Sequence, residues 1–169
     1  DGIRDIGVTG VQTCALPISG NSYLPPNPVN GAGVADQGAN IAGSVCTAYH
    51  ANVLAQYTSP AGNGSPYGFS STYWQTNDYY EARASTTGFA NISFSWDQCR
   101  SSTGPSSFRL IMSTDGTNWT NVQDYTVLQS GGGGAPGTWS TTTYNAIYTT
   151  TVTIAGGVAD NQAQVIFRM

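Results

Sequence analysis

The stretch NISFSWDQ, residues 91–98, decides the fold of this chain. Apolar Ile92, Phe94 and Trp96 alternate along it with two serines and an aspartate. A period of two is the period of a β-strand, because successive side chains of a strand point to opposite faces. We therefore predict a strand here, with its aromatic face in the core and its polar face in solvent.

Other parts of the chain repeat this alternation. Residues 107–113 (SFRLIMS) place Phe, Leu and Met on one face. The Asp-Gly pair at 115–116 supplies the positive φ that a tight hairpin needs, so residues 119–128 are predicted to form the return strand. Further strands are expected at 45–57, 78–85, 144–154 and 163–169.

Composition agrees with a chain of short strands. Glycine occurs 21 times and tyrosine ten times, which favours strands joined by tight turns. About eight strands are expected, and no segment has a helical period. We predict an all-β fold, an antiparallel β-sandwich that is jelly-roll-like.

Charge narrows the range of partners. Only 8% of residues are charged, lysine is absent, and the net charge is −4. No basic run marks a surface for nucleic acid or for an anionic membrane, so neither is an expected partner. A surface covered by Ser, Thr, Asn and Gly is typical of bacterial extracellular modules.

The N-terminal part divides into two predicted segments. Residues 1–18, DGIRDIGVTGVQTCALPI, resemble a read-through translation of a sequencing-library adapter. We expect them not to belong to the natural protein, which removes Cys14 from the cysteine count; the alternative is a short strand before a turn at Pro17. Residues 19–44 are rich in Gly, Pro and Asn and are predicted to be a flexible leader. Residues 45–169 are then one sandwich domain, expected to be truncated at its C-terminus.

Short motifs follow one another through residues 57–169. They are SPAGNGSPYGFSS at 59–71, W-x3-DYY at 74–80, STTGF-x-NISFSWDQ at 85–98, RSSTGPSSF at 100–108, MSTDGTNWT at 112–120, TYNAIYT at 143–149 and VIFRM at 165–169. Their order and spacing resemble a family of bacterial exported proteins, many of which carry a C-terminal PEP-CTERM sorting signal. The resemblance implies a β-sandwich outside the cell or at the bacterial cell surface. It implies contact with the membrane only through a C-terminal anchor beyond Met169.

Aromatic residues are the main functional feature. Trp119 follows the Asp-Gly turn and Trp139 follows a glycine-rich loop, so both are candidates for an exposed platform on which sugar rings stack. The alternative is core packing, since aromatic residues favour sheets in any case.

Two cysteines remain once Cys14 is set aside. In an oxidising compartment, Cys46 and Cys99 form a natural pair, and we predict a disulfide between them. The alternative is two thiols whose Cα atoms lie too far apart to be bridged.

Catalytic groups are sparse. His50 is the only histidine; a Ser-His-Asp triad could use it, but no Gly-x-Ser-x-Gly elbow is present. We therefore interpret His50 as a half-exposed polar strand residue. Glu81 and Asp97 could meet across neighbouring strands as a carboxylate pair, although ion pairs with Arg83 and Arg100 are the simpler interpretation.

Metal ligands are equally sparse. Asn77–Asp78 and Asp160–Asn161 could hold a structural calcium ion, while the alternative is that they form turns. One histidine and two cysteines are too few for a zinc site, and no cofactor is predicted.

These features predict a non-catalytic, exported module of the cell surface or extracellular matrix that binds polysaccharide. The alternative is an accessory domain of a larger extracellular hydrolase or nuclease, because similar sandwiches lie beside nuclease and lamin-tail modules. A third hypothesis is a hydrolase that uses His50 or a carboxylate pair.

Overall fold

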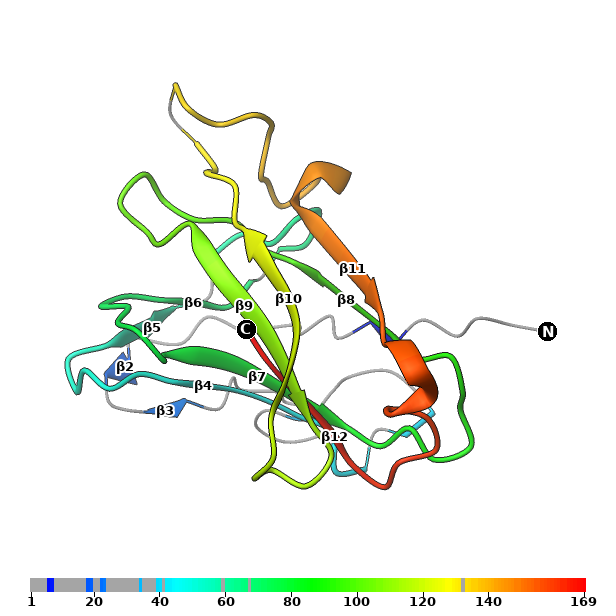
Figure 1. Ribbon diagram of the computed structural model, residues 1–169. Coiled ribbons are helices and arrows are strands. Elements are labelled where there is room, and N and C mark those ends of the chain that lie inside the picture. Colours follow the sequence, from blue (N-terminus) through cyan, green and yellow to red (C-terminus); the bar gives the residue numbers. More distant parts are fainter. Residues whose placement is uncertain are drawn as a thin grey trace.

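The computed structural model describes residues 6–7, 18–19, 22–23, 34, 39–40, 42–58, 60–66, 68–131 and 133–169. Nine strands lie between residues 45 and 169, and three strands of two residues each precede them (Figure 1). The helical elements of these residues are two single 3-10 turns, η1 (Ala146–Tyr148) and η2 (Ala155–Gly157). The chain is therefore all-β, as the alternation predicted.

The larger sheet has six strands, and every pair in it is antiparallel. Their order across the sheet is β10 (Thr120–Thr126), β9 (Ser107–Ser113), β12 (Val165–Arg168), β7 (Tyr79–Ala84), β4 (Val45–Tyr49) and β3 (Ser22–Tyr23). The last strand in the sequence, β12, thus lies in the middle of the sheet, between β9 and β7.

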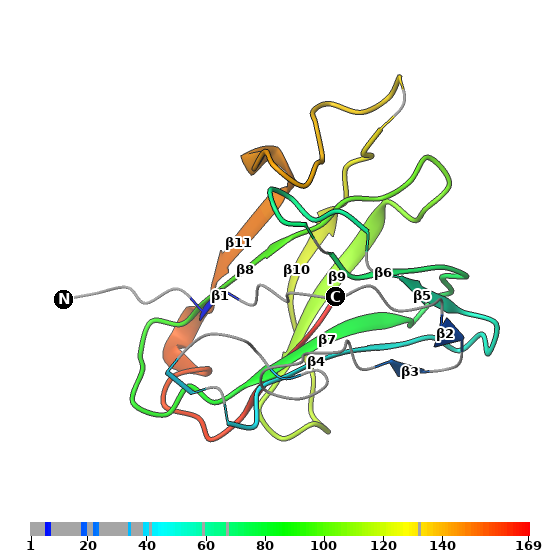
Figure 2. The same cartoon turned by 180° about the vertical axis from the view of Figure 1, so that it is seen from behind.

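Two smaller sheets of three strands complete the fold. In one, β8 (Ser93–Asp97) pairs antiparallel with β11 (Thr149–Thr153) and parallel with β1 (Ile6–Gly7). In the other, β5 (Gln56–Thr58) lies between β2 (Ile18–Ser19) and β6 (Ser70–Ser71). Figures 1 and 2 show the β8–β11 layer set against the large sheet, which is the arrangement of a sandwich.

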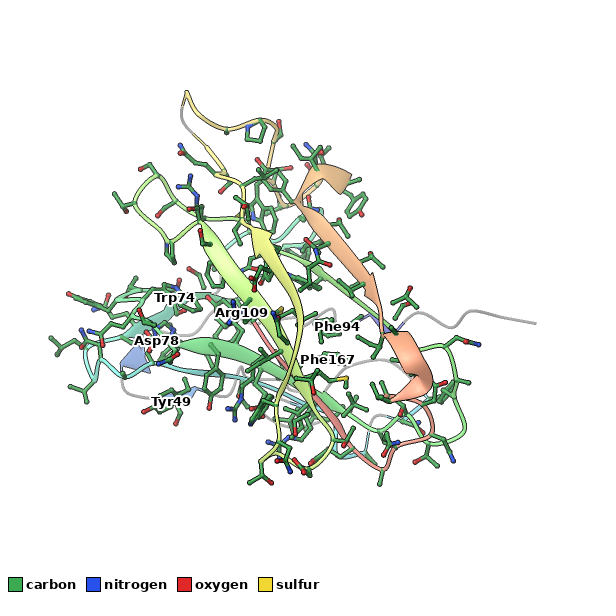
Figure 3. The ribbon with its side chains drawn as sticks, viewed as in Figure 1. Tyr49, Trp74, Asp78, Phe94, Arg109 and Phe167 are labelled. Atoms are coloured by element: carbon green, nitrogen blue, oxygen red, sulfur yellow. The ribbon has the colours of Figure 1, made fainter. Side chains whose placement is uncertain are left out.

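The main core lies between β8 and the large sheet. Phe94 of β8 stacks on Phe167 of β12, with ring centroids 4.2 Å apart and planes inclined by 14° (Figure 3). Both rings are buried, so this contact joins the two layers directly. The other buried members of the cluster are Ala82, Ile92, Leu110, Met112, Ile154, Ala159 and Val165. The predicted inward face of residues 91–98 is confirmed, with Trp96 half-buried against this core.

The hairpin between β9 and β10 turns at the Asp-Gly pair, as predicted. Gly116 has a φ of 77°, which a residue with a side chain rarely adopts. The Asp115 carboxylate accepts hydrogen bonds from the backbone N–H groups of Asn118 and Thr117, at 2.8 Å each. Hydrogen bonds from Asn118, Thr117 and Ser113 hold the pKa of this carboxyl well below its usual value.

Residues 45–57 do not form the single strand predicted. β4 ends at Tyr49, and β5 begins only at Gln56. Between them the Asn52 side chain accepts the N–H of Leu54 at 2.9 Å, and the Asn52 carbonyl accepts the N–H of Ala55 at 3.0 Å. This local turn competes with the extended chain and leaves Leu54 61% exposed.

Residues 144–154 also differ from the prediction. The strand β11 begins at Thr149, because residues 146–148 form the turn η1. Asn145 caps this turn by accepting the N–H of Ile147 at 3.3 Å. As in residues 45–57, an asparagine side chain stabilises a local turn, here where the predicted strand was expected to begin.

Most of the two predicted N-terminal segments, Cys14 included, lies outside the described residues. Of residues 1–18, Ile6–Gly7 pairs with β8 and Ile18 belongs to β2. Of residues 19–44, Ser22–Tyr23 extends the large sheet beside β4. The non-native origin of the first segment and the flexibility of the second stay predictions. In the described ranges, no helix is long and apolar enough to cross a membrane.

The ring contact between the layers yields a stability prediction. Phe94→Leu and Phe167→Leu should each lower the free energy of unfolding by about 1–3 kcal/mol, because each leaves the opposite ring without its partner. The double variant should show a coupling of about 0.5–1.5 kcal/mol in a double-mutant cycle measured by urea unfolding. Ile147→Ala, at an exposed position, is the control. Strictly additive losses would show that the two rings do not interact.

Candidate functional site

The outer face of the large sheet carries aromatic and charged side chains side by side. Tyr49 of β4, Tyr79 of β7 and Arg168 of β12 leave the sheet on this face. Their neighbours in sequence point the other way, and Ala48 and Phe167 are buried in the core. Tyr49 and Tyr79 are directly opposite each other in the β4–β7 register.

These side chains form a stack with Trp119 that runs across the three neighbouring strands β4, β7 and β12. The rings of Tyr49 and Tyr79 lie 5.5 Å apart with an angle of 24° between planes. The guanidinium carbon of Arg168 lies 4.0 Å from the ring centroid of Tyr79 and 4.1 Å from that of Trp119, which directly precedes β10. We call Tyr49, Tyr79, Arg168 and Trp119 the aromatic row. Two cation–π contacts therefore hold one guanidinium between two rings.

A buried carboxylate fixes the same guanidinium from the sheet side. Arg168 donates its Nε hydrogen to Glu81 at 2.7 Å, and Arg83 donates from Nη2 to the other oxygen of Glu81 at 2.7 Å. The Glu81 side chain is only 6% exposed, so it depends on both partners. Glu81 therefore lies between two arginines, Arg83 and Arg168.

Arg168 has donors beyond the one that binds Glu81. Within the described part of the chain, its hydrogen bonds use Nε alone. The hydrogens on Nη1 and Nη2 remain for water or a ligand. Burial raises the pKa of the neighbouring Tyr79 phenol although Arg168 opposes this rise, so Tyr79 stays neutral at physiological pH.

The second predicted sugar-binding tryptophan does not join the row. Trp139 lies in the loop beyond the other end of β10, drawn in yellow and orange in Figure 1. Its indole N–H donates to the carbonyl of Ala61 at 2.6 Å, and its ring meets Tyr148 edge-on at 5.3 Å. Trp139 thus fastens this loop to residues 60–66, and it is half-buried there. Trp119 stays a candidate for binding.

A second polar cluster forms around His50, directly after β4. His50 is fully buried, so the prediction of a half-exposed strand residue is wrong. Its Nδ1 lies 2.9 Å from Asp78 Oδ2, and its Nε2 lies 2.9 Å from Ser71 Oγ. Ser71 Oγ in turn lies 2.8 Å from the hydroxyl of Tyr80. We call His50, Ser71, Asp78 and Tyr80 the His50 cluster.

Aromatic rings enclose the imidazole. Trp74 meets it edge-on with centroids 4.5 Å apart, and Tyr57 does so at 5.5 Å. Figure 3 shows Trp74 next to Asp78, at the end of β7 remote from Phe94. Burial lowers the pKa of His50, while Asp78 and the backbone of Tyr73 oppose this shift. His50 is therefore neutral at pH 7.

The residues proposed for calcium bind backbone groups instead. Asp78 accepts the N–H of Ala51 at 2.8 Å and that of Gln75 at 2.6 Å. At the other predicted pair, Asp160 accepts the N–H of Ile92 at 3.3 Å and Asn161 accepts that of Gly88 at 2.9 Å. Among the described residues, no three His, Cys, Asp or Glu side chains lie close enough together to hold a metal ion.

The predicted disulfide is not formed, and both cysteines are free. Cys46 lies on β4 in the large sheet, opposite Ala82, whereas Cys99 follows β8 in the other layer. The thiol of Cys99 is hydrogen-bonded with the side chain of Ser130. Burial raises the pKa of the Cys46 thiol to about 11, which keeps it protonated and unreactive.

Glu81 and Asp97, the possible carboxylate pair, do not meet. Glu81 lies on β7 in the large sheet, while Asp97 lies on β8 in the other layer and accepts a hydrogen bond from Thr149 at 2.5 Å. The expected ion pair of Glu81 with Arg83 is present, but it is buried on the Glu81 side instead of solvated. Arg100 binds the carbonyl of Val127 at 3.1 Å.

The sequence pattern missed most of both clusters. Tyr49, Tyr79 and Arg168 belong to predicted strands, and the alternation of each strand is visible, but their meeting depends on the cross-strand register. Ser71 and Asp78 carry no motif that distinguishes them from the other serines and aspartates of the chain.

Comparisons with protein-family models, curated proteins and solved structures found no match to this chain. The case for a function therefore depends on the geometry of these two clusters.

His50 yields a pH prediction, because it is the only histidine of the chain. Its pKa is lower in the folded state than in the unfolded state, so the unfolded chain binds the proton more readily. The free energy of unfolding should be constant above about pH 6.5 and fall as the pH drops towards about 5. Urea unfolding across this range measures it, and His50→Gln should remove the dependence. A wild-type stability that rises on acidification would contradict the account.

Proposed function

We propose that this chain is a polysaccharide-binding module that acts outside a bacterial cell or at its surface, and that the aromatic row is its binding surface. The observation that carries the proposal is the guanidinium of Arg168, held between the rings of Tyr79 and Trp119. Aromatic rings beside planar hydrogen-bond donors are what a chain of sugar rings requires, since such a chain has apolar faces and polar edges.

The contacts of Arg168 with Tyr79, Trp119 and Glu81 order its side chain before a ligand binds. A free arginine side chain loses about 0.5–1.5 kcal/mol of conformational freedom when a ligand immobilises it. Tyr79, Trp119 and Glu81 have already imposed this order in the folded protein. The Nη groups of Arg168 can therefore bind a ligand at a smaller cost in conformational entropy.

The chemistry of these donors favours a carboxylate. A guanidinium presents paired N–H groups that match the two oxygens of a carboxylate or phosphate. Arg83 adds a second cation beside the same carboxylate. We therefore propose an acidic polysaccharide, one that carries uronic acid residues, as the ligand.

Tyr49 supplies the place for a sugar ring. One face of Tyr79 is covered by Tyr49 and the other by Arg168, so its role is to support its neighbours. Tyr49 stands at the end of the row and is 39% exposed. A sugar next to the bound carboxylate can stack there, in the manner by which exposed aromatic rings bind sugars.

Retention on immobilised polyuronate and on cellulose tests the proposal. The wild type should be retained on polyuronate and released by salt, because salt screens the charges that make the contact. Arg168→Gln and Trp119→Ala should each weaken retention at least about tenfold, which is about 1.4 kcal/mol. Tyr144→Ala removes an exposed tyrosine outside the row and should change nothing.

Two results would count against this function. Equal retention of wild type, Arg168→Gln and Trp119→Ala would show that the row is not the binding surface. Absence of wild-type retention on both supports would show that the chain is not a module of this kind. Circular dichroism of each variant separates lost binding from lost folding.

A further inference from the structure

Three side chains of the His50 cluster meet in the order that nucleophilic catalysis requires. Asp78 lies 2.9 Å from Nδ1 of His50, and Nε2 of the same ring lies 2.9 Å from the hydroxyl oxygen of Ser71. Such a triad is recognised by its geometry and by the role of each group, and unrelated folds build it in different chain orders. Here the chain order is His50, Ser71, Asp78.

These distances are compatible with the proton arrangement that catalysis requires. In it, Nδ1 carries hydrogen and faces the Asp78 carboxylate, which can only accept. Nε2 accepts the hydroxyl hydrogen of Ser71, and the hydroxyl of Tyr80, 2.8 Å from Ser71 Oγ, can donate to that oxygen.

The backbone holds Asp78 in place. Its carboxylate accepts the N–H of Ala51, the residue after His50, and the N–H of Gln75. These two bonds orient the carboxylate towards the imidazole and tie the turn after β4 to the start of β7. A carboxylate whose one role was to close its own turn would not need a contact with His50.

We propose that Ser71, His50 and Asp78 form a catalytic triad and that this chain hydrolyses small carboxylic esters. The Ser71 oxygen forms a bond to the carbonyl carbon of the ester while its proton moves to Nε2 of His50. The C–O bond to the alcohol then breaks, and the alcohol leaves with that proton. Water repeats the two steps, releases the carboxylic acid and restores Ser71.

Tyr80 is placed to stabilise the transition state. The negative charge that develops on the carbonyl oxygen needs a donor close to Ser71 Oγ, and tyrosine hydroxyls serve in this way. The next backbone N–H along the chain, that of Thr72, donates to the carbonyl of Gln56 at 3.1 Å. The hydroxyl of Tyr80 is therefore the nearest donor that can turn to the substrate.

Access to the triad limits the substrate. His50 has no exposed surface, whereas Ser71 is half-buried on β6, at the edge of its sheet. The antiparallel pairing of β5 with β6 continues to Gln56 and Thr72. Val53, Leu54 and Tyr73, close to these positions in the sequence, are all more than half exposed. Ser71 is thus the one triad residue with appreciable exposed surface, which suits a small ester with an apolar acyl group.

The backbone next to the site is unusual. Tyr73, two residues after Ser71, has a φ of 58°, which is uncommon for a bulky side chain. Strained positions of this kind persist only where the surroundings enforce them, and they cluster at functional sites.

Labelling with a fluorophosphonate probe tests the triad on the wild-type chain. Peptide mass spectrometry should locate the label on Ser71, and acid should reduce labelling as His50 becomes protonated. Hydrolysis of p-nitrophenyl acetate should fall to the uncatalysed rate in Ser71→Ala. Asp78→Asn should lower the rate on the order of 10,000-fold. Tyr80→Phe should lower it by about 100- to 1,000-fold.

Ser70→Ala is the matched control, because it removes a hydroxyl from the same strand and should leave labelling and hydrolysis unchanged. A wild-type chain that is folded by circular dichroism and takes no label at Ser71 would overturn the proposal. Hydrolysis by Ser71→Ala at the wild-type rate would do the same. If Ser71→Ala does not fold, the labelling of the wild type decides alone. No polysaccharide enters these assays, so their outcome is independent of the binding function.

Discussion

The stacking of Phe94 on Phe167 is the contact on which the architecture depends. It joins β8 of one layer to β12, the strand in the middle of the other layer. β12 has only four residues, yet it pairs with β7 and β9 and completes the six-stranded sheet. The next residue after Phe167 is Arg168, which the alternation of the strand turns to the opposite face. The strand that builds the core therefore also places the cation of the proposed binding surface.

The fold could be predicted where side-chain alternation alone determines the outcome. Residues 91–98 and 107–113 form the expected strands with the expected faces. Their apolar side chains all lie on one face of the strand, so burying that face in the core is the only way to remove them from water. Prediction failed where an asparagine side chain bonds the backbone nearby. Asn52 closes a turn inside one predicted strand and Asn145 caps a turn inside another. Propensity in these segments favours strand, and local hydrogen bonds override it.

The functional clusters were less predictable than the fold, for a different reason. Trp119 could be singled out from its place after the Asp-Gly turn, but its partner Arg168 is 49 positions away, in a strand that reaches the turn only through its pairing with β9. Ser71 meets His50 only because a short turn reverses the chain after β4 and sets β5 beside β6. Both sites depend on the cross-strand register and on the order of the strands in the sheet. Neither the register nor the strand order can be recognised in a single sequence. The same sheet topology thus supplies an aromatic row on one face and a buried triad at one edge.

The short strand β12 is a fixed, interior part of the large sheet, and both layers depend on it. Native-state hydrogen exchange of the backbone amides measures this directly. Amides of β12 that bond to β7 and β9 should exchange only through global unfolding, with the slowest rates in the molecule. Amides of the loop that contains Gly131 and Gly133 should exchange far faster. If the β12 amides exchange as fast as that loop, the strand is not held in the sheet, and the placement of both Phe167 and Arg168 is wrong.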